Sequence, residues 1–125
     1  KFDLIYRENV MEKELIVKVF DIVKTHTPEG RTSDDGETGG DNVRKTIIDN
    51  WESYEKISIL FDGIVKMSRV FVDEAFAKIL ESRTLDEINE KIFFPDAKEA
   101  TVKELNSALK LRRKILASQR DREEN

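Results

Sequence analysis

The fold of this chain is decided by the stretch Lys56-Ile57-Ser58-Ile59-Leu60-Phe61-Asp62-Gly63. Its apolar run is bounded by an Asp-Gly turn signal, which predicts a short buried strand at 56–61. Helical spacing of apolar residues predicts a helix before it, at 41–51, and another after it, at 70–80. The apolar faces of these two helices are formed by Val43, Ile47, Ile48 and Trp51, and by Phe71, Ala75, Phe76, Ile79 and Leu80. A buried strand between two amphipathic helices is typical of an α/β fold.

Further elements are expected on both sides of this unit. Residues 15–23 carry a helical stripe but are dense in β-branched residues and run into Thr-Pro, so we interpret them as a strand. Residues 2–6 alternate apolar and polar side chains, as an edge strand does, and 92–94 form a short strand before Pro95. A short capped helix begins near Thr84. A long helix spans 101–120, with Val102, Leu105, Leu109, Ile115 and Leu116 facing inward. This order predicts parallel neighbouring strands with helices packed against them.

The composition bounds the class of protein. The chain has 125 residues, enough for one domain with a real core. We divide it into an N-terminal extension or edge strand at 1–13, a domain at 14–118 and a polar tail at 119–125 that is expected to fray. The net charge of −4 gives no signal for nucleic acid or membrane, and no apolar run approaches the length of a membrane span. There is no cysteine, which is compatible with a cytoplasmic location.

Residues 25–42 form a long polar loop with no aliphatic, Met, Phe, Tyr or Trp side chain. One interpretation is an anion site in which backbone N–H groups converge at the start of the helix at 41–51. Its ligand contacts would come from Gly30, Arg31, Gly36, Gly39, Gly40 and Arg44. Four carboxylates in the same stretch, Asp34, Asp35, Glu37 and Asp41, would repel a phosphate, and the Gly-Lys-Ser/Thr ending of a P-loop is missing. We therefore favour a mobile surface loop.

Other candidate residues have ordinary structural explanations. Asp62 follows a strand, where an α/β enzyme can place a catalytic carboxylate, but an Asp-Gly turn explains it as well. His26 has no second ligand type beside it, so no metal site is expected. Trp51 is expected in the core. The last helix is basic but has no interleaved aromatic residues, so we interpret its basic residues as a solvated face with intramolecular ion pairs rather than as a nucleic-acid site. These residues are Lys110, Arg112, Arg113, Lys114, Arg120 and Arg122.

Two motifs, in order and correctly spaced, carry a resemblance to a known family. The first is Thr27-Pro28-Glu29-Gly30-Arg31 with Asp35-Gly36-Glu37-Thr38-Gly39-Gly40-Asp41-Asn42-Val43-Arg44. The second is Ile59-Leu60-Phe61-Asp62-Gly63 with Phe71-Val72-Asp73-Glu74-Ala75-Phe76-Ala77. Together they resemble the bacterial STAS-like domain of unknown function, over residues 16–80. The chain departs from the family pattern at Gly39-Gly40, where Ser-Gly is common, at Arg69-Val70, where paired serines are common, and at Ala77, where glycine is common.

The resemblance implies a STAS-like α/β fold with a mixed sheet of about four strands and helices packed against it. It also implies a non-enzymatic regulatory module that binds a protein partner, such as a kinase-like protein or an ATPase, with no catalytic residue, metal or cofactor. The implied interaction surface is Ser68, Arg69, Phe71, Asp73 and Glu74, although Phe71 is also expected in the core. In related anti-sigma-factor antagonists a hydroxyl at this strand-to-helix junction is phosphorylated, and Ser68 is the candidate here. A helix N-cap is the favoured role for Ser68. The alternative function is a nucleotide- or phosphate-binding domain, or an enzyme, that uses the glycine-rich loop.

Overall fold

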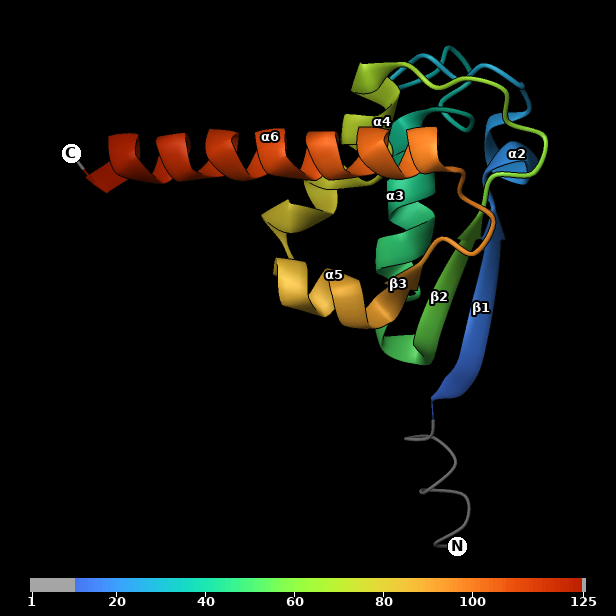
Figure 1. Ribbon diagram of the computed structural model, residues 1–125, viewed down its shortest axis with the longest axis horizontal. Coiled ribbons are helices and arrows are strands. Elements are labelled where there is room, and N and C mark those ends of the chain that lie inside the picture. The colour runs from blue at the N-terminus through green and yellow to red at the C-terminus, as the bar shows by residue number, and fades with distance from the viewer. Residues whose placement is uncertain (1–10, 125) are drawn as a thin grey trace, which may run out of the picture.

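The computed structural model describes residues 11–124, and the edge strand expected at 2–6 lies outside them. The described elements alternate between strands and helices (Figure 1). In chain order they are β1 (Glu12–Lys18), α2 (Val19–Val23), α3 (Gly40–Asp49), the 3-10 helix η1 (Trp51–Ser53), β2 (Tyr54–Leu60), α4 (Arg69–Ala75), the 3-10 helix η2 (Ala77–Glu81), α5 (Leu85–Lys91), β3 (Ile92–Phe93) and α6 (Glu99–Glu124).

Within residues 11–124 the sheet has three strands in the order β1-β2-β3, and both pairings are parallel. The expected mixed sheet of about four strands is therefore wrong for this part of the chain. Helical segments join each strand to the next and return the chain to the same end of the sheet, which makes the neighbouring strands parallel. The α/β class and the parallel neighbours are confirmed.

The two faces of the sheet differ in burial. Ile57 pairs with Leu15 and Ile92, and on this face Val17, Ile57 and Ile59 are buried beneath the helices. Ser58 lies on the opposite face, where its neighbours Ile16 and Phe93 are 54% and 41% exposed. The core thus lies between one face of the sheet and the helical layer.

The first strand is shorter than expected. β1 ends at Lys18, and the chain turns into α2 at Val19 instead of continuing as a strand to residue 23. Val19 and Val23 stand one helical turn apart and both enter the core. Lys24, in the left-handed conformation with φ of 59°, ends the helix. The helical stripe in this segment outweighed the β preference of its residues because it allows both valines to be buried.

The remaining helices largely follow their predictions. α3 and α5 lie where the spacing and the Thr84 cap place them, and Thr84 and Glu87 form a reciprocal capping box. The helix expected at 70–80 is interrupted at Phe76, where α4 gives way to η2. α6 continues through residues 119–124, where the sequence predicts a frayed tail. Leu105 is buried on α6 as expected, but Val102 is 42% exposed.

In the part of the chain that the structure describes, the largest fully buried side chains come from both the sheet and the helices, and Ser58 is the one polar residue among them. They are Phe71, Ile47, Ile57, Ile59, Ile79, Val19, Val43, Val72 and Ser58. Trp51 is also buried, as expected. Among the helices of residues 11–124, none combines the length and the apolar character that crossing a membrane requires.

Candidate functional site

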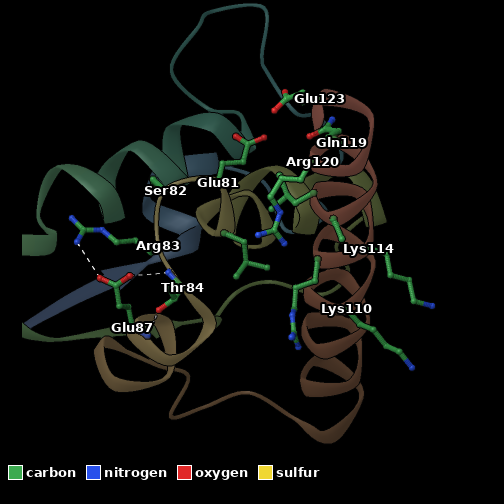
Figure 2. A pocket seen from close by; sticks show the side chains of 14 residues that line it. Glu81, Ser82, Arg83, Thr84, Glu87, Lys110, Lys114, Gln119, Arg120 and Glu123 are labelled. Carbon is green, nitrogen blue, oxygen red and sulfur yellow. Dashed lines mark hydrogen bonds and ion pairs between the residues drawn. The ribbon is translucent and has the colours of Figure 1, made fainter. Parts of the chain in front are cut away.

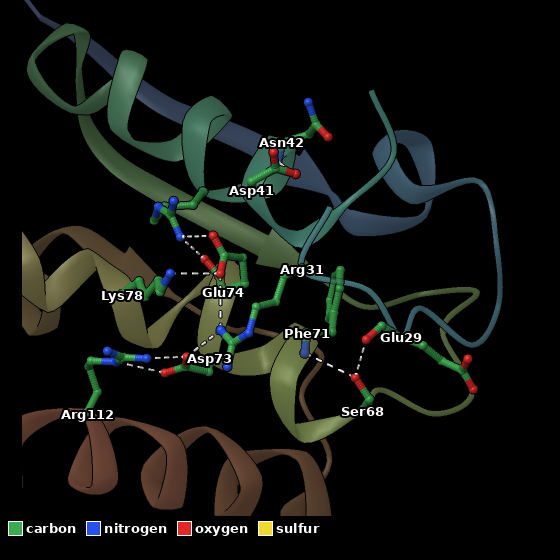
Figure 3. A network of polar contacts seen from close by, with 11 residues as sticks. Glu29, Arg31, Asp41, Asn42, Ser68, Phe71, Asp73, Glu74, Lys78 and Arg112 are labelled. Atoms are coloured by element: carbon green, nitrogen blue, oxygen red, sulfur yellow. Dashed lines mark hydrogen bonds and ion pairs between the residues drawn. The ribbon is translucent and has the colours of Figure 1, made fainter. Parts of the chain in front are cut away.

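Helix α4 carries two adjacent carboxylates at the centre of an ion-pair network (Figure 3). Asp73 accepts hydrogen bonds from Arg31 at 2.7 Å and from Arg112 Nε at 3.0 Å. Arg31 comes from the polar loop and Arg112 from α6, so Asp73 ties both segments to α4. The guanidinium of Arg112 is largely buried in this contact, with 11% of its side chain exposed.

Glu74 is the more deeply buried of the two carboxylates, with 7% of its side chain exposed. It forms ion pairs with Arg31 at 3.1 Å, Arg44 of α3 at 2.9 Å and Lys78 at 3.0 Å. Arg44 also donates to the backbone carbonyl of Glu74. A buried carboxylate is tolerated when it is paired and fully hydrogen-bonded, and Glu74 meets this condition.

The network holds both carboxyl groups in the charged form. Burial alone would raise the pKa of Asp73 and of Glu74, but hydrogen bonds from the surrounding cations outweigh it and lower both pKa values. Hydrogen bonds to these carboxylates raise the pKa of Arg31 and Arg112. A general acid or base needs a pKa near the working pH, so these groups are suited to holding the fold together rather than to proton transfer.

The sequence indicated only part of this network. Arg31 and Arg44 were expected as phosphate contacts, and instead they bind the carboxylates of α4. Lys78 stands four residues after Glu74, a spacing that places them side by side on a helix and could have revealed the pair. Arg112 was expected on a solvated face with intramolecular ion pairs. The ion pair is confirmed, but the solvated position is wrong because Arg112 is buried against Asp73, a partner that local spacing could not reveal.

The glycine-rich end of the polar loop, residues 36–42, leaves no row of free backbone donors for an anion. Consecutive N–H groups from Gly36 to Asn42 all have acceptors within the loop or at the start of α3. Gly40 donates to the carbonyl of Gly30 at 3.0 Å, and Asp41 donates to that of Arg31 at 2.9 Å. The predicted convergence of N–H groups on a ligand is therefore wrong, because the loop itself caps α3.

Close packing accounts for three of the loop glycines. A Cβ on Gly39 would lie 2.6 Å from the Cα of Thr32, and one on Gly30 would lie 2.5 Å from the carbonyl oxygen of Thr32. A Cβ on Gly40 would lie 3.1 Å from Cβ of Glu74. These glycines let the loop, α3 and α4 approach one another, which is the packing role of glycine rather than a ligand-cradling one.

The loop is hydrogen-bonded to the connection between β2 and α4. The carbonyl of His26 accepts from the N–H groups of Val65 and Lys66, and that of Pro28 accepts from Ser68. The His26 ring bonds the carbonyl of Gly63. His26 thus holds two loops together, a role that the sequence did not suggest.

Ser68 is the N-cap of α4, as favoured from the sequence. Its Oγ accepts from the N–H of Phe71 at 3.1 Å and donates to the carbonyl of Glu29 at 2.6 Å. The N-cap interpretation is therefore confirmed. Phosphorylation of Ser68 stays a prediction.

The exposed part of this connection differs from the predicted interaction surface. We define the junction surface as the exposed residues Val65, Lys66, Arg69 and Val70; Val65 is 79% and Val70 45% exposed. The prediction of Phe71 as a surface residue is wrong, because it is 0% exposed and packs in the core. Asp73 and Glu74 are occupied by their ion pairs, which leaves Arg69 and the half-buried Ser68 from the predicted set. The sequence prediction did not include Val65, although Ile64 and Val65 directly follow the Asp62-Gly63 turn and could have indicated it.

The carboxyl end of β2 is closed by a side chain that the sequence did not single out. Asp96 accepts from the N–H of Phe61 at 2.9 Å and from that of Asp62 at 3.0 Å. Ligands of open α/β sheets bind beyond the strand ends, and here Asp96 takes the N–H groups at that position. Asp62 itself is exposed in its turn. The residues the structure describes also bring no three His, Asp or Glu side chains together in a metal-binding arrangement.

No protein-family model, curated protein or solved structure matches this chain. The STAS-like resemblance thus rests on the motifs in the sequence and stays a prediction.

Proposed function

We propose that this chain is a STAS-like regulatory domain that binds a protein partner through the junction surface and performs no catalysis itself. The observation that carries the proposal is the exposure of Val65 and Val70, two β-branched apolar side chains flanked by Lys66 and Arg69. A contiguous exposed apolar surface rimmed by polar residues is a feature of interaction sites, and we propose that Val65 and Val70 form part of one. Their position, at the strand-to-helix junction, is the one that the family resemblance implies.

The surroundings give this surface a fixed shape. Hydrogen bonds from backbone N–H groups of this connection to the His26 and Pro28 carbonyls hold the backbone beneath it, and the ion pairs of Asp73 and Glu74 hold α4 in place. A preorganised surface loses less conformational entropy when it binds. Lys66 and Arg69 favour a partner that presents carboxylates around an apolar contact. On the family resemblance we propose a kinase-like ATPase or another signalling protein as that partner.

The alternative, a nucleotide- or phosphate-binding domain or enzyme, has less support. Arg31 and Arg44 already pair with carboxylates, and the N–H groups of residues 36–42 already have acceptors. A phosphate would have to displace these contacts and would meet the carboxylates of the loop. If a panel of nucleotides and inorganic phosphate raises the melting temperature of the protein, the alternative gains support at the expense of our proposal.

The proposal is tested by placing charge on the apolar part of the junction surface. The Val65→Asp/Val70→Asp variant and wild type are immobilised, ATPases retained from a lysate of the native cells are identified, and binding is remeasured with the purified ATPase. Leu111→Asp is the control, because Leu111 is an apolar side chain that is 60% exposed on α6 and does not belong to the junction surface. We expect wild type and the control to bind alike and the double variant to bind at least about tenfold more weakly. Equal binding by all three proteins would contradict the proposal.

A further inference from the structure

The C-terminal part of α6 and the segment that joins α4 to α5 enclose a groove (Figure 2). α6 crosses the body of the domain and then extends past α5, with its C-terminal end far from the sheet (Figure 1). The groove has a volume of about 820 Å³. Its walls are residues 80–84 with Glu87 on one side and the stretch of α6 from Lys110 to Glu123 on the other.

The lining of the groove combines apolar and basic side chains. Leu80 on one wall and Leu116 and Ala117 on the other are its apolar part. Arg113 and Arg120 lie close to them on α6, and Figure 2 shows Arg120 reaching toward the wall that carries Glu81 and Ser82. Neither arginine pairs with a carboxylate among the side chains that the structure describes. Both are therefore available as cations beside an apolar strip.

The other charged side chains that the structure describes in the lining form no ion pair with these arginines. Arg83 forms ion pairs with Glu52 at 2.9 Å and with Glu87, and its guanidinium lies over the ring of Trp51. Lys110 and Lys114 extend from the outer side of α6 in Figure 2 and keep that edge basic. Glu81 and Glu123 are the remaining acidic residues of the groove.

We propose that this groove is a docking site for an amphipathic helix of a partner protein, with leucine-type residues on one face and carboxylates along its flanks. The apolar face would cover Leu80, Leu116 and Ala117, and the carboxylates would pair with Arg113 and Arg120. A helix fits because the exposed part of α6 offers a straight wall several turns long.

The same features argue against two other occupants. A second copy that apposed its own α6 would bring basic side chains against basic side chains, which is repulsive. Nucleic acid would find no aromatic side chain in the lining for base stacking, whereas the apolar strip offers it nothing to bind. Both remain outcomes of the test below.

This docking site is separate from the proposed function. The connection between β2 and α4 lies near one end of the molecule's long axis, and the C-terminus of α6 lies at the other (Figure 1). A variant that disrupts one surface should leave the other intact, so the two proposals can fail independently.

The probe is a synthetic amphipathic helical peptide of about 18 residues, with leucines at i, i+3, i+4 and i+7 and glutamates on both flanks. Binding to the full chain is measured by fluorescence anisotropy. We expect saturable binding that weakens as salt rises, and at least about a tenfold loss of affinity in Arg113→Glu/Arg120→Glu. In ¹⁵N-correlation spectra of the wild-type protein, the amide signals that move should belong to residues 80–87 and 110–123.

Arg122→Glu is the control for the single variant Arg120→Glu, because it makes the same change in charge and residue 122 lies on the side of α6 opposite residue 120. A scrambled peptide of the same composition controls for charge alone. The proposal is overturned if the scrambled peptide binds equally well, if Arg122→Glu weakens binding as much as Arg120→Glu, or if a single-stranded RNA binds more tightly than the peptide. Concentration-dependent dimerisation that Leu116→Glu abolishes would also overturn it, in favour of a second copy as the occupant.

Discussion

Glu74 joins three segments of the chain through one side chain. Its partners Arg31, Arg44 and Lys78 come from the polar loop, α3 and the start of η2. In Glu74→Gln three partly exposed cations lose the buried carboxylate that they share, and Arg31 keeps only its contact with Asp73. We expect the free energy of unfolding to fall by about 3 kcal/mol, measured by urea titration.

A surface ion pair on a neighbouring helix is the control for this substitution. Lys45 and Asp49 form an i,i+4 pair whose side chains are 71% and 55% exposed. Asp49→Asn should hardly change the midpoint of the urea titration, because solvent screens such pairs. If the two variants lose the same stability, Glu74 is not the centre of the network.

Gly39 is a second residue whose role depends on its surroundings. A Cβ there would meet the backbone of Thr32 at 2.6 Å, and backbone cannot move aside cheaply. We expect Gly39→Ala to lower the free energy of unfolding by about 2 kcal/mol. Gly36 has φ of +74° and open space around its Cβ position. Because Asn tolerates that conformation, Gly36→Asn should leave the free energy of unfolding nearly unchanged in the same urea titration.

At the scale of elements, α6 divides into a docked part and an exposed part. Leu105 and Arg112 are buried against the body, whereas the described side chains from Ala117 onward are exposed. Deletion of residues 119–125 should leave the free energy of unfolding within about 0.5 kcal/mol of wild type, because few contacts are lost. The helical circular-dichroism signal should nevertheless decrease, because residues 119–124 belong to α6. A large loss of stability would show that the exposed part contributes to folding.

The elements also show how far local pattern carries a prediction. The strand at β2, the helix at α3 and the cap at Thr84 were predicted because their signals lie within one or two turns of the chain. Residues 15–23 carried strand and helix signals together, and the burial of Val19 and Val23 decided between them. No local pattern in the sequence indicated that the helix is interrupted at Phe76. Phe76, Ala77 and Ile79 on both sides of the interruption are buried, so the apolar pattern continues through it.

At the scale of the molecule, the ion network makes folding sensitive to acid. The pKa of Glu74 is lowered from its ordinary value of 4.5 and that of Asp73 from 3.8, because hydrogen bonds from basic side chains outweigh the effect of burial. The unfolded chain therefore binds more protons than the folded one as the pH falls. The contribution to stability is fully present above the ordinary values and is lost as the pH falls through the folded values.

We expect the free energy of unfolding of wild type to decrease as the pH is lowered from neutrality through this range. For Asp73→Asn/Glu74→Gln, urea titrations at successive pH values should give a lower free energy of unfolding at neutral pH. This free energy should also decrease less steeply as the pH is lowered. A residual slope should remain, because hydrogen bonds also lower the pKa of Asp35 and Glu87. Parallel curves for the two proteins would contradict the assignment of acid sensitivity to the network.

The sequence by itself determined the α/β class, most element positions, the N-cap role of Ser68 and the core position of Trp51, whereas it placed Phe71 both in the core and on the surface. These follow from periodicity and short-range hydrogen bonding, which act between residues close in the chain. Only the tertiary structure decided what the polar loop and its arginines do. The N–H groups of residues 36–42 donate to acceptors in the loop itself or at the start of α3. Arg31 binds Asp73, which lies 42 residues further along the chain. Such pairings depend on how helices and loops pack, and no local pattern of residues encodes them.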